Sequence, residues 1–276
     1  MLFSEPPQTP LDFDFQILGI PVRVSGLFWI LPLVFGIQMG HPFFILASSI
    51  AIFTGVLVHE LGHALVMRRY GISPRIALTM MGGYATENQM NIWNLPGSSS
   101  SQRRTPKQQI MISAAGPFAG FLLAGLVIGL VFIAGGWIDF RFAYNVIPTW
   151  QIQLVAGTPF LREFPGLVTS PSNKDLIHAL ISFSLFVNIY WGILNLLPVY
   201  PLDGGQISRE LMVMKDPHQG FRNSLWLSVM TGAILAFLGL MVLRAPFMGI
   251  LFAVFAYQSY QMIQNLDGKG FGRGPW

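Results

Sequence analysis

Cysteine is absent from this chain of 276 residues. Disulfides and thiolate metal sites are therefore excluded, and any metal ion must be held by histidine or carboxylate side chains. Charge is also scarce, since only 10% of the residues are charged, whereas soluble domains usually carry about 25%. The lysines and arginines form no patch or stripe of the kind that binds nucleic acid. These shortages exclude an ordinary soluble protein and a nucleic-acid-binding protein, and they indicate an integral membrane protein.

Long apolar runs make up most of the chain, in which 53% of the residues are hydrophobic. A membrane-spanning helix needs about 20 predominantly apolar residues. We expect six such helices, at residues 22–39, 43–67, 110–138, 176–197, 225–243 and 246–263. No internal repeat and no soluble domain interrupts them. The sequence therefore predicts an all-α polytopic membrane protein in which residues 1–276 form a single domain.

The basic residues give this arrangement an orientation. With six crossings, both termini and the second and fourth loops lie on one side of the membrane. Basic residues on that side are Arg23, Arg68, Arg69, Arg75, Arg103, Arg104, Lys107, Arg209, Lys215, Arg222, Lys269 and Arg273, and those on the other side are Arg141, Arg162, Lys174 and Arg244. Cytoplasmic loops carry an excess of lysine and arginine. We therefore expect both termini in the cytoplasm, in the plasma membrane of a bacterium or an archaeon.

The second predicted helix carries the sequence His59-Glu60-Leu61-Gly62-His63. Residues four apart lie on one face of a helix, so the two imidazoles can reach one metal ion, with Glu60 beside them. A single histidine on a helix is more often a packing residue. Three ionisable groups within five residues of an apolar run are different, because charge inside a membrane is costly and marks functional sites.

A third ligand must come from elsewhere, because a catalytic zinc ion commonly has three protein ligands and an open position. Asp203 is the candidate, within the run Asn195–Gly205 that follows the fourth predicted helix. The prolines and glycines of this run could merely end the helix. However, the second and fourth helices both run toward the cytoplasm, which places Asp203 and His63 toward the same side. We expect Pro198 and Pro201 to break the helix and turn the chain back toward the metal.

Three sequence features together resemble the site-2 protease family of intramembrane zinc metalloproteases. They are His59-Glu60-Leu61-Gly62-His63, the run Asn195–Gly205, and Ala115-Gly116-Pro117 in the third predicted helix. The resemblance implies a catalytic core at about residues 43–206, followed by two further helices within residues 225–263. The chain looks like a minimal member, because the stretch after the third helix is too short for a PDZ domain and the tail is too short for CBS domains.

The resemblance also implies roles for individual residues. The single zinc ion would be held by His59, His63 and Asp203. Glu60 would be the general base, and Asn195 would help to hold the substrate or the developing oxyanion. Gly82 and Gly83 resemble the family's membrane-dipping hairpin, which presents a strand edge to the substrate. We therefore expect a small membrane-associated β-hairpin between the second and third helices.

The function that these features predict is hydrolysis of peptide bonds in or near the transmembrane segments of other membrane proteins, as in regulated intramembrane proteolysis. The expected partners are a transmembrane protein substrate and the lipid bilayer, and the sequence sets no oligomeric state. Two alternatives remain open, namely a catalytically silent membrane binding protein of the same fold and a metal transporter. Glu60 argues against the first, and the lack of two related halves argues against the second.

Overall fold

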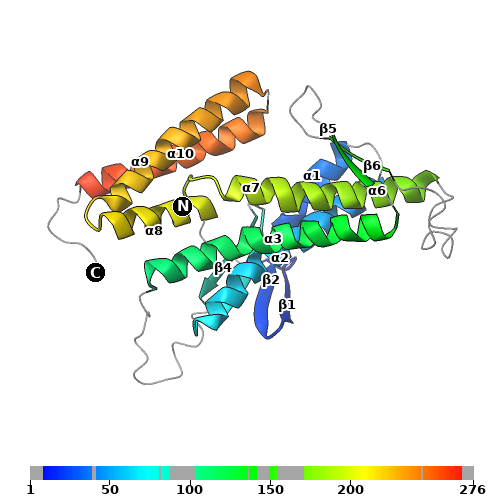
Figure 1. Ribbon diagram of the computed structural model, residues 1–276, viewed down its shortest axis with the longest axis horizontal. Coiled ribbons are helices and arrows are strands. Elements are labelled where there is room, and N and C mark those ends of the chain that lie inside the picture. The colour runs from blue at the N-terminus through cyan, green and yellow to red at the C-terminus, as the bar shows by residue number, and fades with distance from the viewer. Residues whose placement is uncertain are drawn as a thin grey trace. The chain divides into compact units, whose positions relative to one another are not determined.

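The computed structural model describes residues 9–38, 42–80, 82–87, 104–135, 137–141, 149–153, 171–243 and 245–268. The chain divides into two compact units, drawn with their elements in Figure 1. The first unit contains Met1–Ser100 and Ala115–Gly192, and the second contains Ser101–Ala114 and Ile193–Trp276. One long helix, α3 (Pro106–Ile133), begins in the second unit and continues in the first.

A four-stranded sheet belongs to the first unit, with the strand order β1–β2–β3–β4. β1 (Phe13–Ile17) and β2 (Ile20–Val24) form one antiparallel hairpin, and β3 (Pro74–Thr79) and β4 (Gly82–Glu87) form another. β2 and β3 pair in parallel. A parallel pair needs a long crossover connection, and the two helices between β2 and β3 supply it. β4 is consequently at one edge of the sheet.

α2 (Pro42–Arg69) is the central helix of the first unit, where it contacts α1 (Ile30–Gln38), α6 (Pro171–Leu185), β3 and β4. Apolar side chains of α2 and of the inner face of the sheet form one core. Its buried members are Ile20, Val22, Val24, Phe28, Ile52, Val56, Leu57, Ala64, Ile76 and Leu78. Gly62 of α2 also allows α3 to approach closely, because a side chain there would meet Ala119 Cβ at 2.8 Å.

After α6 the helix widens into a π-helical segment, Phe186–Trp191, and ends with α7 (Gly192–Asn195). In the second unit, α8 (Asp203–Lys215) is followed by α9 (Gly220–Phe237) and α10 (Pro246–Gly268). α9 and α10 lie side by side (Figure 1). Gly232 of α9 allows α10 to approach closely, because a side-chain carbon there would lie 3.0 Å from Ala256 Cβ, and small residues at such contacts are common for helices in membranes.

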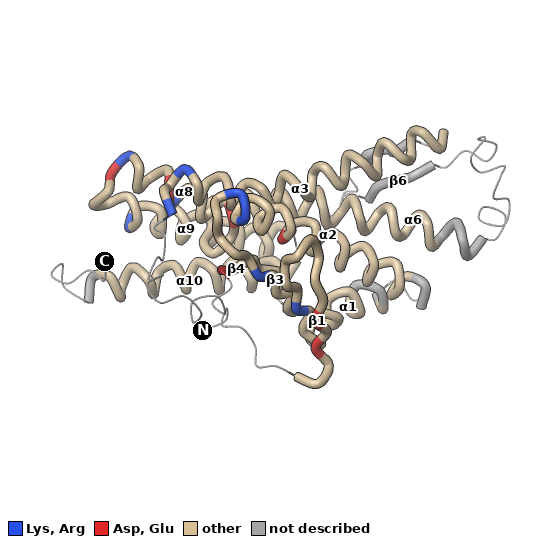
Figure 2. Tube along the Cα trace, turned by 90° about the horizontal axis from the view of Figure 1, so that it is seen from below, with Lys and Arg blue, Asp and Glu red and all other residues tan. Residues whose placement is uncertain are grey.

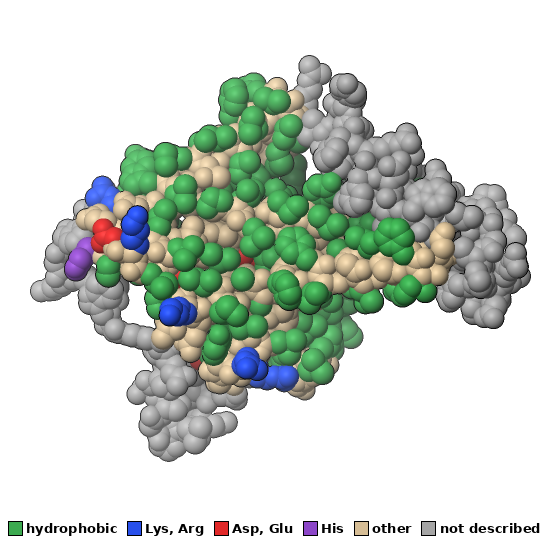
Figure 3. All heavy atoms as spheres, viewed as in Figure 1, with side chains coloured by type: hydrophobic (Ala, Val, Ile, Leu, Met, Phe, Trp, Pro, Cys, Tyr) green, Lys and Arg blue, Asp and Glu red, His purple; other side chains and the backbone are tan. Residues whose placement is uncertain are grey.

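Apolar side chains cover much of the helical surface, as the space-filling view shows (Figure 3). Exposed members recur about every turn along α3 and α9, at Phe118, Leu122, Leu126, Leu130, Met230, Ile234 and Phe237. Charged residues gather in the sheet, at the end of α2 and around the turn between α8 and α9 (Figure 2). Such a surface fits a lipid environment, since water would disfavour so large an apolar area.

Among the described residues, four helices are long and apolar enough to cross a membrane: Phe44–Arg69, Pro106–Ile133, Leu176–Asn195 and Gly220–Val242. They correspond to the second, third, fourth and fifth predicted helices. α10 forms a helix where the sixth was expected but does not meet the same criteria. The prediction of six spans is therefore supported only for four.

Two predicted boundaries are wrong. The first expected span, residues 22–39, is not one helix, because Ile20–Val24 is a strand and α1 has only nine residues. At about 1.5 Å per residue, α1 is far shorter than a bilayer core of about 30 Å. The third expected span ends at Ile133, and Trp137–Arg141 is instead a strand, β5, paired with β6 (Thr149–Gln153). The sheet also has two more strands than the expected hairpin.

Candidate metal centre

α2 brings the two histidines of the sequence motif into contact, with their rings nearly perpendicular at 77°. His59 Nε2 and His63 Nε2 lie 3.1 Å apart, and the side chains of both residues are buried. Two nitrogen ligands bound to zinc at 2.0–2.1 Å and at tetrahedral angles would lie about 3.3 Å apart. The observed pair therefore has the spacing that a single divalent ion requires.

Gly116 of α3 packs directly against this pair. A side-chain carbon at Gly116 would collide with His63 Nε2 and would lie 2.7 Å from His59 Nε2. The missing side chain therefore provides the room in which an ion and the histidines can meet. The sequence analysis used Gly116 only as part of a family motif. Its neighbours Ala114 and Ala115 gave no indication that Gly116 would pack on the histidines.

Glu60 is buried beside the edge strand of the sheet, with only 3% of its surface exposed. A side-chain carbon at Gly83 of β4 would collide with Glu60 Cγ and would lie 2.7 Å from Oε1. The backbone of β4 thus runs against the carboxylate. Gly82 has φ +114°, a conformation that favours glycine, and a side-chain carbon there would lie 3.6 Å from Trp191 Cζ2. Of the two predicted glycines, Gly83 therefore lies at Glu60 and Gly82 shapes the turn into β4.

Asp203 and Asn195 belong to the second unit. The helix ends at Asn195 and a new one starts at Asp203, so the break expected between them is confirmed. Asp203 is the first residue of α8 and is buried, and Asn195 is partly buried. A carboxylate is favoured at a helix N-terminus by the helix dipole. Gly204 and Gly205 allow the new helix to pack on the backbone of the preceding loop, at Leu196 and Tyr200.

The match to known proteins agrees with this arrangement. The profile of peptidase family M50 matches residues 47–239. The chain belongs to this family. Proteins similar to it include a zinc metalloprotease of Methanocaldococcus jannaschii, 26% identical over 88% of this chain and 57% of the relative, and a candidate zinc metalloprotease of Synechocystis sp., 24% identical over 73% of this chain and 37% of the relative. The chain thus spans about half or less of each relative's length.

One solved structure is similar in fold to this chain. The site-2 protease from Methanocaldococcus jannaschii matches with a TM-score of 0.50 and 23% sequence identity, over 90% of this chain and 94% of that chain. This similarity supports the coarse part of the predicted fold, a mostly helical protein with a small sheet.

Asn188 is a buried polar residue that sequence reasoning missed in this M50 chain. It lies in the π-helical segment, with 3% of its surface exposed, and its Nδ2 donates to the carbonyl oxygen of Ser184 at 2.8 Å. Its Oδ1 has no hydrogen-bond partner among the described residues. The amide lies between Gly55 of α2 and Gly120 of α3, each one turn from a residue of the metal centre. A lone asparagine in an apolar run was the available signal.

Proposed function

We propose that this chain is an intramembrane zinc metalloprotease that hydrolyses peptide bonds in or near the transmembrane segments of membrane proteins. The observation that carries the proposal is the buried pair His59–His63 with Glu60 beside it, on a helix long and apolar enough to cross a membrane. Membership of peptidase family M50 supports the same activity.

The proposed metal ligands are His59, His63 and Asp203, a buried group that could hold a metal ion. Two imidazoles and one carboxylate are a common donor set for catalytic zinc and leave one coordination position open. The absence of cysteine agrees with such a set. When bound, zinc acts as a Lewis acid that polarises the scissile carbonyl and makes water more acidic.

Glu60 is the proposed general base. Its carboxylate accepts a proton from the attacking water while the water oxygen adds to the scissile carbonyl carbon. The same group then gives the proton to the leaving nitrogen as the carbon–nitrogen bond breaks. Burial keeps the carboxylate away from bulk solvent, and Gly83 leaves peptide backbone as its nearest neighbour on the sheet side.

The edge strand β4 is the proposed docking site for the substrate. A peptide bond inside an intact helix is hidden in hydrogen bonds, so the substrate must unwind, and pairing with a strand edge compensates its exposed backbone groups. β4 pairs with β3 through one edge, and its Gly83 adjoins Glu60. Asn195 is proposed to hold the substrate or the developing oxyanion, as in the family that the motifs resemble.

Replacement of Glu60 by glutamine tests the proposal. Glu60→Gln keeps the shape of the side chain and removes its basicity, so purified protein should retain one zinc ion per chain and lose about 10²–10⁴-fold in cleavage rate of a membrane substrate. Glu210→Gln is the matched control, because Glu210 pairs with Arg209 on α8 and has no proposed catalytic role. Near-normal cleavage by the zinc-loaded Glu60→Gln protein would refute the base.

The same preparation separates the alternatives. If the chain is a silent binding protein, even the wild-type protein should bind the substrate without cleaving it, so no product should form that a chelator could suppress. A transporter would move zinc into sealed vesicles, which the proposed protease should not do. Either result would replace the proposed function.

A further inference from the structure

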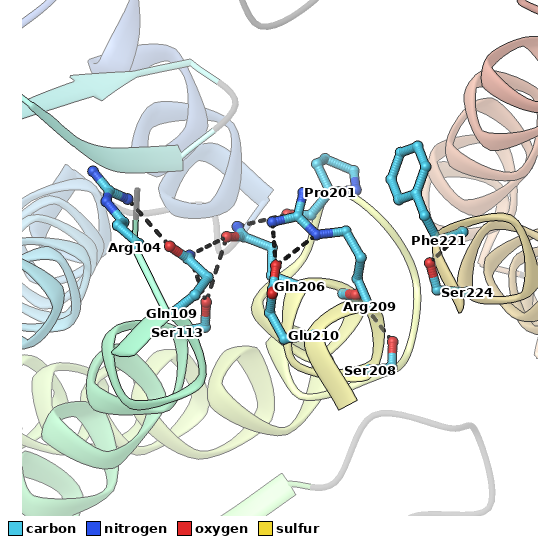
Figure 4. Close-up of polar contacts among 11 residues, drawn as sticks. Arg104, Gln109, Ser113, Pro201, Gln206, Ser208, Arg209, Glu210, Phe221 and Ser224 are labelled. Carbon is cyan, nitrogen blue, oxygen red and sulfur yellow. Dashed lines mark hydrogen bonds and ion pairs between the residues drawn. The ribbon is translucent and has the colours of Figure 1, made fainter. Parts of the chain in front are cut away.

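A group of hydrogen-bonded residues, Gln206, Gln109 and Ser113, begins one helical turn after Asp203, and the proposed mechanism does not use it. We call this group the polar joint. Gln206 of α8 donates from Nε2 to the carbonyl oxygen of Pro201 at 3.4 Å. Its Oε1 accepts hydrogen bonds from Gln109 Nε2 at 2.9 Å and from Ser113 Oγ at 3.4 Å. One amide therefore connects the first turns of α3, the loop before α8, and α8 itself (Figure 4).

The α3 side of the joint is itself held in place. Gln109 Nε2 also lies 3.3 Å from Ser113 Oγ, and Arg104 Nη1 donates to Gln109 Oε1 at 3.2 Å. Ser113 is buried, with 2% of its surface exposed. The hydrogen bonds of this network are partly buried, and a polar network of this kind rigidifies the segments that it joins.

The loop between α7 and α8 is fastened a second time, from α9. Ser228 Oγ accepts a hydrogen bond from the backbone N–H of Tyr200 at 3.0 Å and donates to the carbonyl oxygen of Pro198 at 3.5 Å. The loop that leads to Asp203 is thus held by Ser228 at Pro198 and Tyr200, and by Gln206 at Pro201. Only the second fastening reaches α3.

α3 carries the joint and the metal centre on one face. Gln109, Ser113 and Gly116 are spaced by four and three residues, which places them in one stripe along a helix. The first two hydrogen bond to Gln206, and Gly116 packs on His59 and His63. The same helix therefore carries the residues that hydrogen bond to Gln206 and the glycine that packs on the histidines.

We propose that Gln206 is a positioning residue that holds Asp203 in register with α3 and thereby strengthens zinc binding. The proposal rests on the proposed function, in which Asp203 is a ligand. Groups that orient the ligands of a metal site typically contribute about 10–100-fold in metal affinity. Here the neutral amide of Gln206 contacts the loop and α3, so it fixes the position of the loop without adding a charge near the metal centre.

The test measures the apparent dissociation constant of zinc by competition with a chelator, on the full-length protein in detergent. Gln206→Ala and Gln109→Leu should each weaken zinc binding by about 10-fold or more. The double variant should bind zinc no more weakly than the weaker-binding of the two single variants, because both changes remove the same joint. The unfolding temperature without zinc should stay near that of the wild type, whereas the increase on adding zinc should shrink.

Ser208→Ala is the matched control. Ser208 Oγ donates to the carbonyl oxygen of Gly205 at 3.0 Å within α8, so its removal should leave zinc binding unchanged. Gln109→Leu leaves α8 unaltered and decides the question even if Gln206→Ala fails to fold. Additive effects in the double variant, or wild-type zinc affinity in both single variants, would overturn the proposal.

Asp203→Ala, measured in the same assay, separates the positioning role of Gln206 from the proposal that Asp203 is a metal ligand. If Asp203→Ala weakens zinc binding while the joint variants do not, Asp203 stands as a ligand and Gln206 has no positioning role. If Asp203→Ala binds zinc as tightly as the wild type, the ligand assignment is wrong and the positioning proposal falls with it.

Discussion

At the scale of single residues, the metal centre depends on glycines, whose lack of a side chain leaves room for neighbouring groups. Gly116 leaves room beside the two histidines, Gly83 lets the sheet reach Glu60, and Gly62 lets α3 approach α2. The histidines and the glutamate could be predicted from the sequence, because their spacing on a helix has a direct chemical meaning. The role of Gly116 could not, because it depends on which helix crosses α2 and at what height.

Gly116→Ala should weaken zinc binding by about 10-fold or more, since crowding a packed site typically costs about 1–3 kcal/mol. Chelator competition on the purified protein measures the effect. Gly125→Ala is the matched control, because the same change in the same helix meets no atom within 4 Å. Equal zinc affinity in the two variants would show that the space beside the histidines does not matter.

At the scale of elements, helices were easier to predict than strands. α2 follows from one long apolar run that ends at two arginines. β2 was hidden, because its five residues merge into the apolar residues of the next helix and lose their alternating pattern. Its partner β3 lies about 50 residues further along the chain, and parallel pairing over such a separation leaves no local signal. The same limit hid the contact between Gln206 and Gln109.

The β1–β2 hairpin is fastened by one buried ion pair. Asp12 Oδ2 accepts hydrogen bonds from Arg23 Nε at 2.8 Å and from Nη2 at 2.5 Å. Asp12 Oδ1 accepts from the Thr9 hydroxyl at 2.6 Å and from the Gly26 N–H at 3.2 Å. The hydrogen bond from Thr9, and after it those from Arg23 and Gly26, hold the pKa of the Asp12 carboxyl well below its ordinary value of 3.8.

A lowered pKa makes the stability of this hairpin depend on pH. Its contribution is fully present above the ordinary value of 3.8 and is lost as the pH falls further toward the folded-state pKa. The unfolding temperature of the wild type in detergent should therefore drop below about pH 4 more steeply than that of Asp12→Asn, which should be less stable at neutral pH. Glu87→Gln, an exposed change in the same sheet, should follow the wild type. Parallel curves for Asp12→Asn and the wild type would contradict the prediction.

At the scale of the whole molecule, the composition and the basic residues predict how the chain lies in a membrane. Apolar helices and membership of family M50 support an integral membrane protein. The number of crossings is harder to predict, because α1 and α10 are apolar helices that composition alone did not distinguish from spans. The orientation therefore needs a direct measurement.

Single cysteines provide that measurement, because the natural chain contains none. Ser100→Cys should be protected from an impermeant thiol reagent added to intact cells, and Ser170→Cys should be labelled, if both termini are cytoplasmic. Both positions lie outside the described residues. Lysed cells, in which both cysteines become accessible, are the control. Labelling of Ser100→Cys in intact cells would reverse the predicted orientation.

The contact between Gly83 and Glu60 has a consequence for which bond is cut. A substrate paired with β4 advances by about 3.4 Å per residue, and its side chains alternate between the two faces of the sheet. A slip of one residue would therefore turn every side chain to the wrong face, whereas a slip of two restores the same faces and the same hydrogen bonds. If β4 binds the substrate as proposed, secondary cleavage products should differ from the main product by two residues, because the structure of a strand repeats every two residues.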